Sequence, residues 1–224
     1  MSEKRILRDL HILDNNKVEL NSRHVYYNYN PDNIRILKVL IIPNVYPYED
    51  GLFLFEFTFP DDYPHIPPQV IFYPKQNYAR MHPNFYENGK VCLSVINTWG
   101  DEDWTPSMSI LSIITILESR FDSRSLCYEP CREKSLQVEI DNNNKIIEYA
   151  KYLSICDILE LCNREKNIYN SFYDIIINYH KNTIEKIKNF ISPLKILYQV
   201  CYSHHVYIDY RIIKQRLENI YINP

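Results

Sequence analysis

Three side chains that could do chemistry stand close together in the sequence: His82, Asn84 and Cys92. Cys92 lies in an irregular, glycine-containing stretch, where we expect an accessible thiol that is not buried in a core. Acyl transfer from sulfur to an amine passes through a tetrahedral oxyanion, which a fixed side-chain amide such as that of Asn84 can stabilise by donating a hydrogen bond. His82 is a candidate general base.

Two other uses of the cysteines fit the sequence less well. A cysteine protease needs a histidine base and an orienting residue; His204 and His205 are available in the tail, but no protease signature surrounds Cys92. Metal binding by Cys127, Cys131 and a histidine lacks the second half of a ligand set. None of the six cysteines forms a C-x-x-C pair. We therefore expect free thiols and no metal site.

The composition is that of a globular protein. Of the 224 residues, 46% are hydrophobic and 24% are charged, with a formal net charge of −3. These values exclude a disordered chain and argue against a dedicated nucleic-acid binder or a membrane-surface protein. No apolar run approaches the roughly 18 residues of a membrane span, and the charged start of the sequence is unlike a secretion signal. We expect a cytoplasmic location, with the nucleus as the alternative.

Proline and glycine separate a first part with strands from a helical tail. Nine of the 13 prolines lie between Pro31 and Pro83, and all three glycines lie in the first 100 residues. Short β-rich runs joined by short connections predict a four-stranded antiparallel meander, at residues 24–29, 34–42, 52–59 and 69–73. Two helices flank this sheet; their apolar residues at helical spacing are Ile6, Leu7, Leu10 and Leu13, and Ile110, Ile113, Ile114 and Leu117.

The tail carries three amphipathic stretches, at residues 146–159, 168–198 and 206–220, which we expect to be helical. The third stretch includes Val206, Tyr210, Ile213 and Leu217. The sequence thus predicts an α+β fold with an N-terminal helix, a four-stranded antiparallel sheet and C-terminal helices. We divide it into a core of residues 1–132 and a helical extension of residues 133–224 that packs on the core.

Four motifs in a fixed order give this pattern a family resemblance. They are Tyr48-Glu49-Asp50-Gly51-Leu52-Phe53, an F-P-x-x-Y-P-x-x-P-P run at residues 59–68, His82-Pro83-Asn84 with a cysteine eight residues after the asparagine, and Trp104-Thr105-Pro106 opening a helix. The sequence resembles the ubiquitin-conjugating enzyme family in all four. The span between Cys92 and Trp104 is longer than in short members, and this length and the tail are similar to the long, Z-type members.

The resemblance implies a function and roles for individual residues. Cys92 accepts ubiquitin or a ubiquitin-like modifier as a thioester from an activating enzyme, then passes it to a substrate lysine or a ligase. Asn84 is the oxyanion donor, His82 a structural residue rather than a base, and Pro83 a stiffener of the backbone. The chain itself needs no cofactor, because the activating enzyme consumes the ATP.

Partner surfaces follow from the same resemblance. Lys4, Arg5 and Arg8, expected on the outer side of the first helix, match the family's contacts with the activating enzyme. The ligase-binding positions fall on two loops, at His65 and Ile66 and at Thr105, Pro106 and Ser107. A solvated helix face and ordinary loop chemistry are the alternatives.

Two departures from the family bear on the acceptor. Ser94 and Tyr128 stand where many members have aspartate, which is thought to prepare the incoming lysine; Glu129 is a possible substitute. Transfer only to a hydroxyl or cysteine acceptor is therefore one alternative function. A non-catalytic ubiquitin-binding adaptor on the same fold is another, although such variants typically lack the cysteine.

Overall fold

The computed structural model describes residues 2–73, 80–100, 103–164, 172, 174–176, 195–199 and 204–222. The chain forms two compact units, each built from several segments. The first unit contains residues 1–43, 53–75 and 84–121, and the second contains residues 44–52, 76–83 and 122–224.

The first unit is an antiparallel sheet with helices, as the sequence predicts. The helices are α1 (Ser2–Asn15), α2 (Lys17–Ser22) and α3 (Ile110–Ser119). The strands are β1 (Val25–Asn30), β2 (Asn33–Ile41), β3 (Phe53–Thr58) and β4 (Gln69–Tyr73), in the order β1-β2-β3-β4. This arrangement confirms the predicted four-stranded meander.

The pairing of β2 with β3 puts one apolar row of side chains in the core. Val39 pairs with Phe55, and both are fully buried. The neighbouring pair is Lys38 and Glu56, whose charged groups lie 3.7 Å apart. Because successive side chains of a strand point to opposite faces, this register puts the aromatic row in the core.

Helices α1 and α3 bury one face each. Ile110, Ile113, Ile114 and Leu117 are all buried, as expected. In α1, Ile6, Leu10 and Leu13 are buried, but Leu7 is 53% exposed. Leu7 lies outside the buried stripe because a residue directly after Ile6 lies about 100° around the helix from it, away from the positions i, i+4 and i+7.

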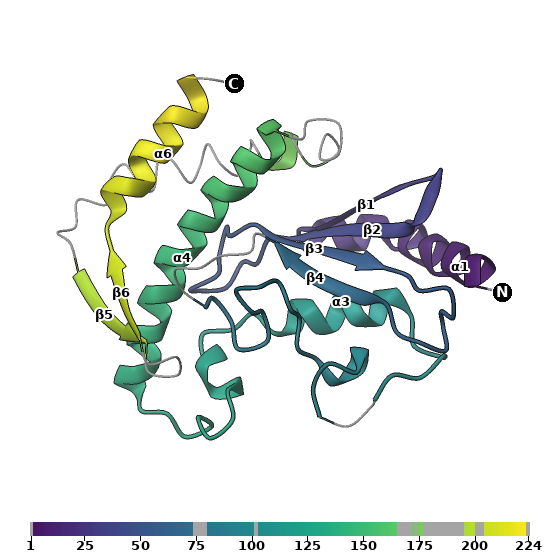
Figure 1. Ribbon diagram of the computed structural model, residues 1–224, viewed down its shortest axis with the longest axis horizontal. Coiled ribbons are helices and arrows are strands. Elements are labelled where there is room, and N and C mark those ends of the chain that lie inside the picture. The colour runs from purple at the N-terminus through teal and green to yellow at the C-terminus, as the bar shows by residue number, and fades with distance from the viewer. Residues whose placement is uncertain are drawn as a thin grey trace. The chain divides into compact units, whose positions relative to one another are not determined.

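The second unit contains a long helix, a hairpin and a shorter helix. They are α4 (Gln137–Arg164), β5 (Lys195–Gln199) with β6 (His204–Ile208), and α6 (Tyr210–Ile222). Arg216 of α6 pairs with Asp157 of α4 at 2.6 Å, and the Tyr210 ring lies 5.5 Å from that of Tyr149. These contacts hold α6 alongside α4 (Figure 1).

The hairpin corrects the expectation of an entirely helical extension. Val206, assigned to the last helix, lies in β6, and α6 begins only at Tyr210. Val206 and Ile208 are buried while Tyr207 is 62% exposed, so the period here is two and not 3.6. Most of the predicted stretch at residues 168–198, Ile168 included, lies outside the described residues.

None of the described helices is long and apolar enough to cross a membrane.

We predict that α6 contributes to stability through its buried face. Ile213 is fully buried and Ile212 is 49% exposed, so the two isoleucines form a matched pair. Ile213→Ala should lower the free energy of unfolding by about 2–5 kcal/mol, because it leaves a cavity. Ile212→Ala should change it by less than about 1 kcal/mol. Equal effects in urea denaturation would show that α6 is not packed this way.

Candidate active site

Asn84 and Cys92 face each other across a short hairpin. The Cys92 N–H donates to the Asn84 carbonyl oxygen at 2.8 Å, the Tyr86 N–H donates to the Lys90 carbonyl oxygen at 2.9 Å, and Phe85 bridges with Val91 between them. The sequence separation of eight residues is therefore the spacing that pairs positions 84 and 92. The hairpin turns at Gly89, whose φ of 89° favours glycine.

The hairpin is fixed to the sheet and to the core of the first unit. The Phe72 N–H of β4 donates to the Gly89 carbonyl oxygen at 2.8 Å, and Ile71 bridges with Lys90. The Phe85 ring, only 1% exposed, lies 5.2 Å from the ring of Phe55 and 5.5 Å from those of Phe72 and Phe121. A strand edge and an aromatic cluster thus position the pair Asn84 and Cys92.

The Asn84 amide is directed at the cysteine itself. Its Nδ2 donates to the Cys92 carbonyl oxygen at 2.7 Å. Together with the Cys92 N–H bond, this makes two hydrogen bonds between the same two residues. The side-chain amide is therefore held at a fixed place beside the backbone of the candidate nucleophile.

The expectation of an accessible Cys92 is wrong. Cys92 is only 2% exposed, and its Sγ donates to the Thr98 carbonyl oxygen at 3.3 Å. The chain after Cys92 folds back through a single 3₁₀ turn (Ser94–Ile96) and Asn97, which has a left-handed φ of 56°. A stretch without regular secondary structure can still be buried. Here the returning chain places the Thr98 carbonyl oxygen against the thiol.

Thr98 closes this return and is a residue that sequence reasoning missed. Its Oγ1 accepts from the Leu93 N–H at 2.9 Å and donates to the Leu93 carbonyl oxygen at 3.0 Å. Its own N–H donates to the same Leu93 oxygen at 3.1 Å. Only the structure could reveal this role, because a threonine in a loop gives no sequence signal of its partner.

The other described cysteines have different surroundings. Cys131 is exposed and Cys127 half-buried. Cys156 and Cys162 are buried in α4, and burial raises the pKa of Cys156 to about 12. Cys156 is therefore a poor nucleophile at neutral pH. Cys201 lies outside the described residues.

His82 and Pro83 fall in the second unit. His82 is 1% exposed, and its ring centroid lies 5.9 Å from that of Tyr48 and 5.8 Å from that of Tyr128. The Tyr48 hydroxyl donates to the Met81 carbonyl oxygen at 2.9 Å, and burial raises its pKa. An enclosed ring between two tyrosines fits the predicted structural role better than that of a base.

The surroundings of Tyr128 contain one carboxylate, that of Asp122, that was not predicted from the sequence. The Tyr128 hydroxyl donates to the Asp122 carboxylate, and Tyr128 is 40% exposed. Ser94 and Glu129 are half-buried. Asp122 thus supplies a carboxylate next to Tyr128.

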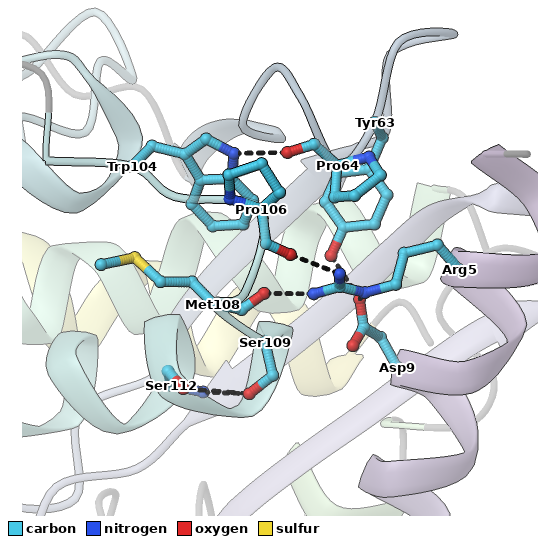
Figure 2. Close-up of polar contacts among 9 residues, drawn as sticks. All are labelled: Arg5, Asp9, Tyr63, Pro64, Trp104, Pro106, Met108, Ser109 and Ser112. Carbon is cyan, nitrogen blue, oxygen red and sulfur yellow. Dashed lines mark hydrogen bonds and ion pairs between the residues drawn. The ribbon is translucent and has the colours of Figure 1, made fainter.

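The predicted partner surfaces are exposed, with one exception. Lys4 and Arg8 are exposed on α1, and both loop sets are exposed, at His65, Ile66, Thr105, Pro106 and Ser107. The expectation that Arg5 lies on the outer side is wrong: its side chain is 18% exposed and binds main-chain carbonyls (Figure 2). Residues three or four apart share a helix face, so Arg5 lies on the same inward face as Asp9. Lys4 lies on a different face.

No cluster of histidine, cysteine and acidic side chains that could hold a metal ion occurs among the residues with described positions.

Comparison with known proteins agrees with the geometry. A family model described as "Ubiquitin-conjugating enzyme" matches residues 5–156. The chain belongs to the ubiquitin-conjugating enzyme family. The match includes the hairpin of Asn84 and Cys92 and both predicted ligase-binding loops.

Curated relatives confirm the resemblance to Z-type members. Ubiquitin-conjugating enzyme E2 Z of Homo sapiens is 36% identical over 136 residues, which are 58% of this chain and 38% of that protein. Ubiquitin-conjugating enzyme E2 2 of Candida glabrata is 39% identical over 122 residues, covering 54% of this chain and 68% of the relative. A structure of human ubiquitin-conjugating enzyme E2 G1 covers 51% of this chain and 88% of its own, at 32% identity and a TM-score of 0.43. The chain spans less than half the length of the E2 Z proteins.

We predict that the Thr98 side chain limits access to Cys92. Thr98→Ala should speed alkylation of Cys92 relative to the exposed Cys131 by about threefold to tenfold, the equivalent of one net hydrogen bond. Peptide mass spectrometry after timed N-ethylmaleimide treatment measures both rates in one sample. Thr115→Ala, at an exposed position of α3, is the control and should leave the ratio unchanged. No change with Thr98→Ala would mean that this side chain does not cover the thiol.

Proposed function

We propose that this chain carries ubiquitin or a ubiquitin-like modifier as a thioester on Cys92. The Cys92 thiolate attacks the thioester that joins the modifier to the activating enzyme, and the activating enzyme's cysteine leaves as a thiolate. An acceptor amine, or a ligase cysteine, later attacks the same carbonyl carbon and releases the Cys92 thiolate. The observation that carries this proposal is the double hydrogen bond between Asn84 and Cys92.

The Asn84 amide fits the role of oxyanion donor. A carboxamide nitrogen has two N–H groups, and Nδ2 of Asn84 already lies 2.7 Å from the carbonyl oxygen of Cys92. The tetrahedral carbon would form on the sulfur of that same residue, so the amide needs only a local adjustment to reach the oxyanion. A donor held this close to the reacting residue stabilises the transition state with little reorganisation.

Charging requires Cys92 to emerge from beneath its own loop. The thiol is 2% exposed and bound to the Thr98 carbonyl oxygen, so this contact must break before an acyl group can reach the sulfur. Opening of the loop after Cys92 is therefore part of charging and limits its rate.

The energy for the reaction comes from ATP consumed by the activating enzyme, so we propose no cofactor for this chain. The adaptor alternative is disfavoured because Cys92 and Asn84 are both present and bonded to each other. On the acceptor side, efficient discharge to free lysine would support a lysine acceptor, and discharge only to hydroxyl or thiol acceptors would contradict it.

A charging assay tests the thioester directly. With an activating enzyme, ATP and a panel of modifiers, the wild-type chain should give one adduct that a reducing agent removes. Cys92→Ser should give an adduct that resists reduction, because an oxyester replaces the thioester. Cys131→Ser, at an exposed cysteine, should charge like the wild type. A Cys92→Ala protein that still charges would refute the proposal.

Asn84→Ala tests the oxyanion role. The variant should accept the modifier but discharge it to free lysine about 100-fold to 1,000-fold more slowly, as the loss of one oxyanion donor implies. The control is Asn88→Ala, which changes an exposed asparagine of the same hairpin. Single-turnover discharge of purified thioester measures both. Equal discharge rates in Asn84→Ala and the wild type would rule the role out.

A further inference from the structure

One arginine joins three segments of the first unit (Figure 2). The Nε of Arg5 in α1 lies 2.9 Å from the Asp9 carboxylate, one turn along the helix. The two terminal nitrogens of the same guanidinium donate to the main-chain carbonyl oxygens of Pro106 and Met108, in the segment that leads into α3. A planar guanidinium holds its donors in a fixed fork, so these bonds set the place of the segment relative to α1.

Asp9 extends this cluster to the proline-rich loop. Its side chain is only 2% exposed and accepts a hydrogen bond from the Tyr63 hydroxyl as well as from Arg5. The Arg5 guanidinium carbon also lies 5.7 Å from the centroid of the Tyr63 ring. Burial, then the bond to Asp9, raises the pKa of Tyr63, so its hydroxyl keeps the proton that it donates. Removing one of the two partners of this buried carboxylate would therefore lower the stability of the fold.

The two loops also contact each other directly. The Trp104 indole Nε1–H donates to the Pro64 carbonyl oxygen at 2.7 Å, and the rings of Trp104 and Tyr63 lie 6.0 Å apart (Figure 2). Beyond Met108, Ser109 caps α3 by accepting from the Ser112 N–H at 3.2 Å. The segment between Trp104 and Ser109 is therefore held by the indole at one end, the cap at the other and Arg5 between them.

We propose that Arg5 is a positioning residue that sets residues 60–66 and 104–108 as one docking surface for the ligase. The inference rests on the proposed function, in that the ligase contacts these loops. Their exposed side chains, Ile66 at 48% among them, sit directly on the backbone that Arg5 and Asp9 hold. Arg5 itself faces inward, so its effect reaches the ligase through the loops and not through contact.

Arg5→Lys is the informative variant. It keeps the positive charge beside Asp9, but a single ammonium group cannot bind a carboxylate and two carbonyls in the geometry of the guanidinium fork. Arg23→Lys is the matched control, because the ion pairs of Arg23 are with Glu19 at 3.2 Å and Glu118 at 3.5 Å, outside both loops. Full-length wild type and both variants are compared throughout.

The first measurement is amide hydrogen exchange in the two loops. The His65 and Met108 N–H groups donate within their own loops, at 2.7 Å to Asp62 and 3.0 Å to Thr105. In Arg5→Lys they should exchange roughly tenfold faster, while amides of β2 and β3 keep wild-type protection. Unchanged loop amides would overturn the inference. Equal acceleration in the sheet would also overturn it, because it would show a general loss of stability.

The second measurement separates binding to the ligase from charging. From a panel of purified ligase domains, the one that most accelerates discharge of the wild-type thioester is titrated against each variant. Arg5→Lys should raise its half-saturating concentration about tenfold, with the discharge rate at saturation and the rate of charging within about twofold of wild type. A charging defect with normal ligase titration would make Arg5 a contact of the activating enzyme. If no domain stimulates the wild type, the ligase step of the proposed function fails, and hydrogen exchange alone decides whether Arg5 positions the loops.

Discussion

The two hydrogen bonds between Asn84 and Cys92 are the constraint on which the proposed chemistry depends. They close a hairpin and fix the amide beside the cysteine, at 2.8 Å through the backbone and 2.7 Å through the side chain. The hairpin keeps its place because β4 binds its turn and Phe85 anchors it in an aromatic cluster. The sheet and its core thus serve chiefly as a rigid support for two residues.

A second constraint acts against the first. The loop that follows Cys92 buries it, with the thiol on the Thr98 carbonyl oxygen. A buried thiol is protected from unwanted reaction, but it must be uncovered for charging. The chain therefore has a rigid side, made by Asn84 and the hairpin, and a side that has to open, made by residues 93–98. The Arg5 cluster applies the same principle to the loops proposed to bind the ligase, since the ion pair of Arg5 with Asp9 holds loops whose tips remain exposed.

The sheet, α1 and α3 could be predicted because their signals are local: hydrophobic period and turn residues. Asn84 and Cys92 could be named as site residues from the family motif and its spacing of eight, but the hairpin that pairs them was not predicted. What failed had no decisive local signal in the sequence. The sequence around Arg5 does not distinguish it from a solvated arginine, because its partners Pro106 and Met108 are about 100 residues away. The burial of Cys92 results from the way residues 93–98 fold back over it, which no residue type in that stretch predicts. The β6 strand was missed because Val206 fits a helical and an alternating pattern equally well over so short a run.

The central claim is that Cys92, and no other cysteine, carries the modifier. The most direct measurement uses a variant in which the other five cysteines are serine, so that Cys92 is the sole thiol; they are Cys127, Cys131, Cys156, Cys162 and Cys201. After incubation with activating enzyme, ATP and modifier, intact-mass spectrometry should show one added modifier, which a reducing agent removes completely. A variant that folds, by its circular dichroism, but gains no such mass while the wild-type chain does would contradict the account.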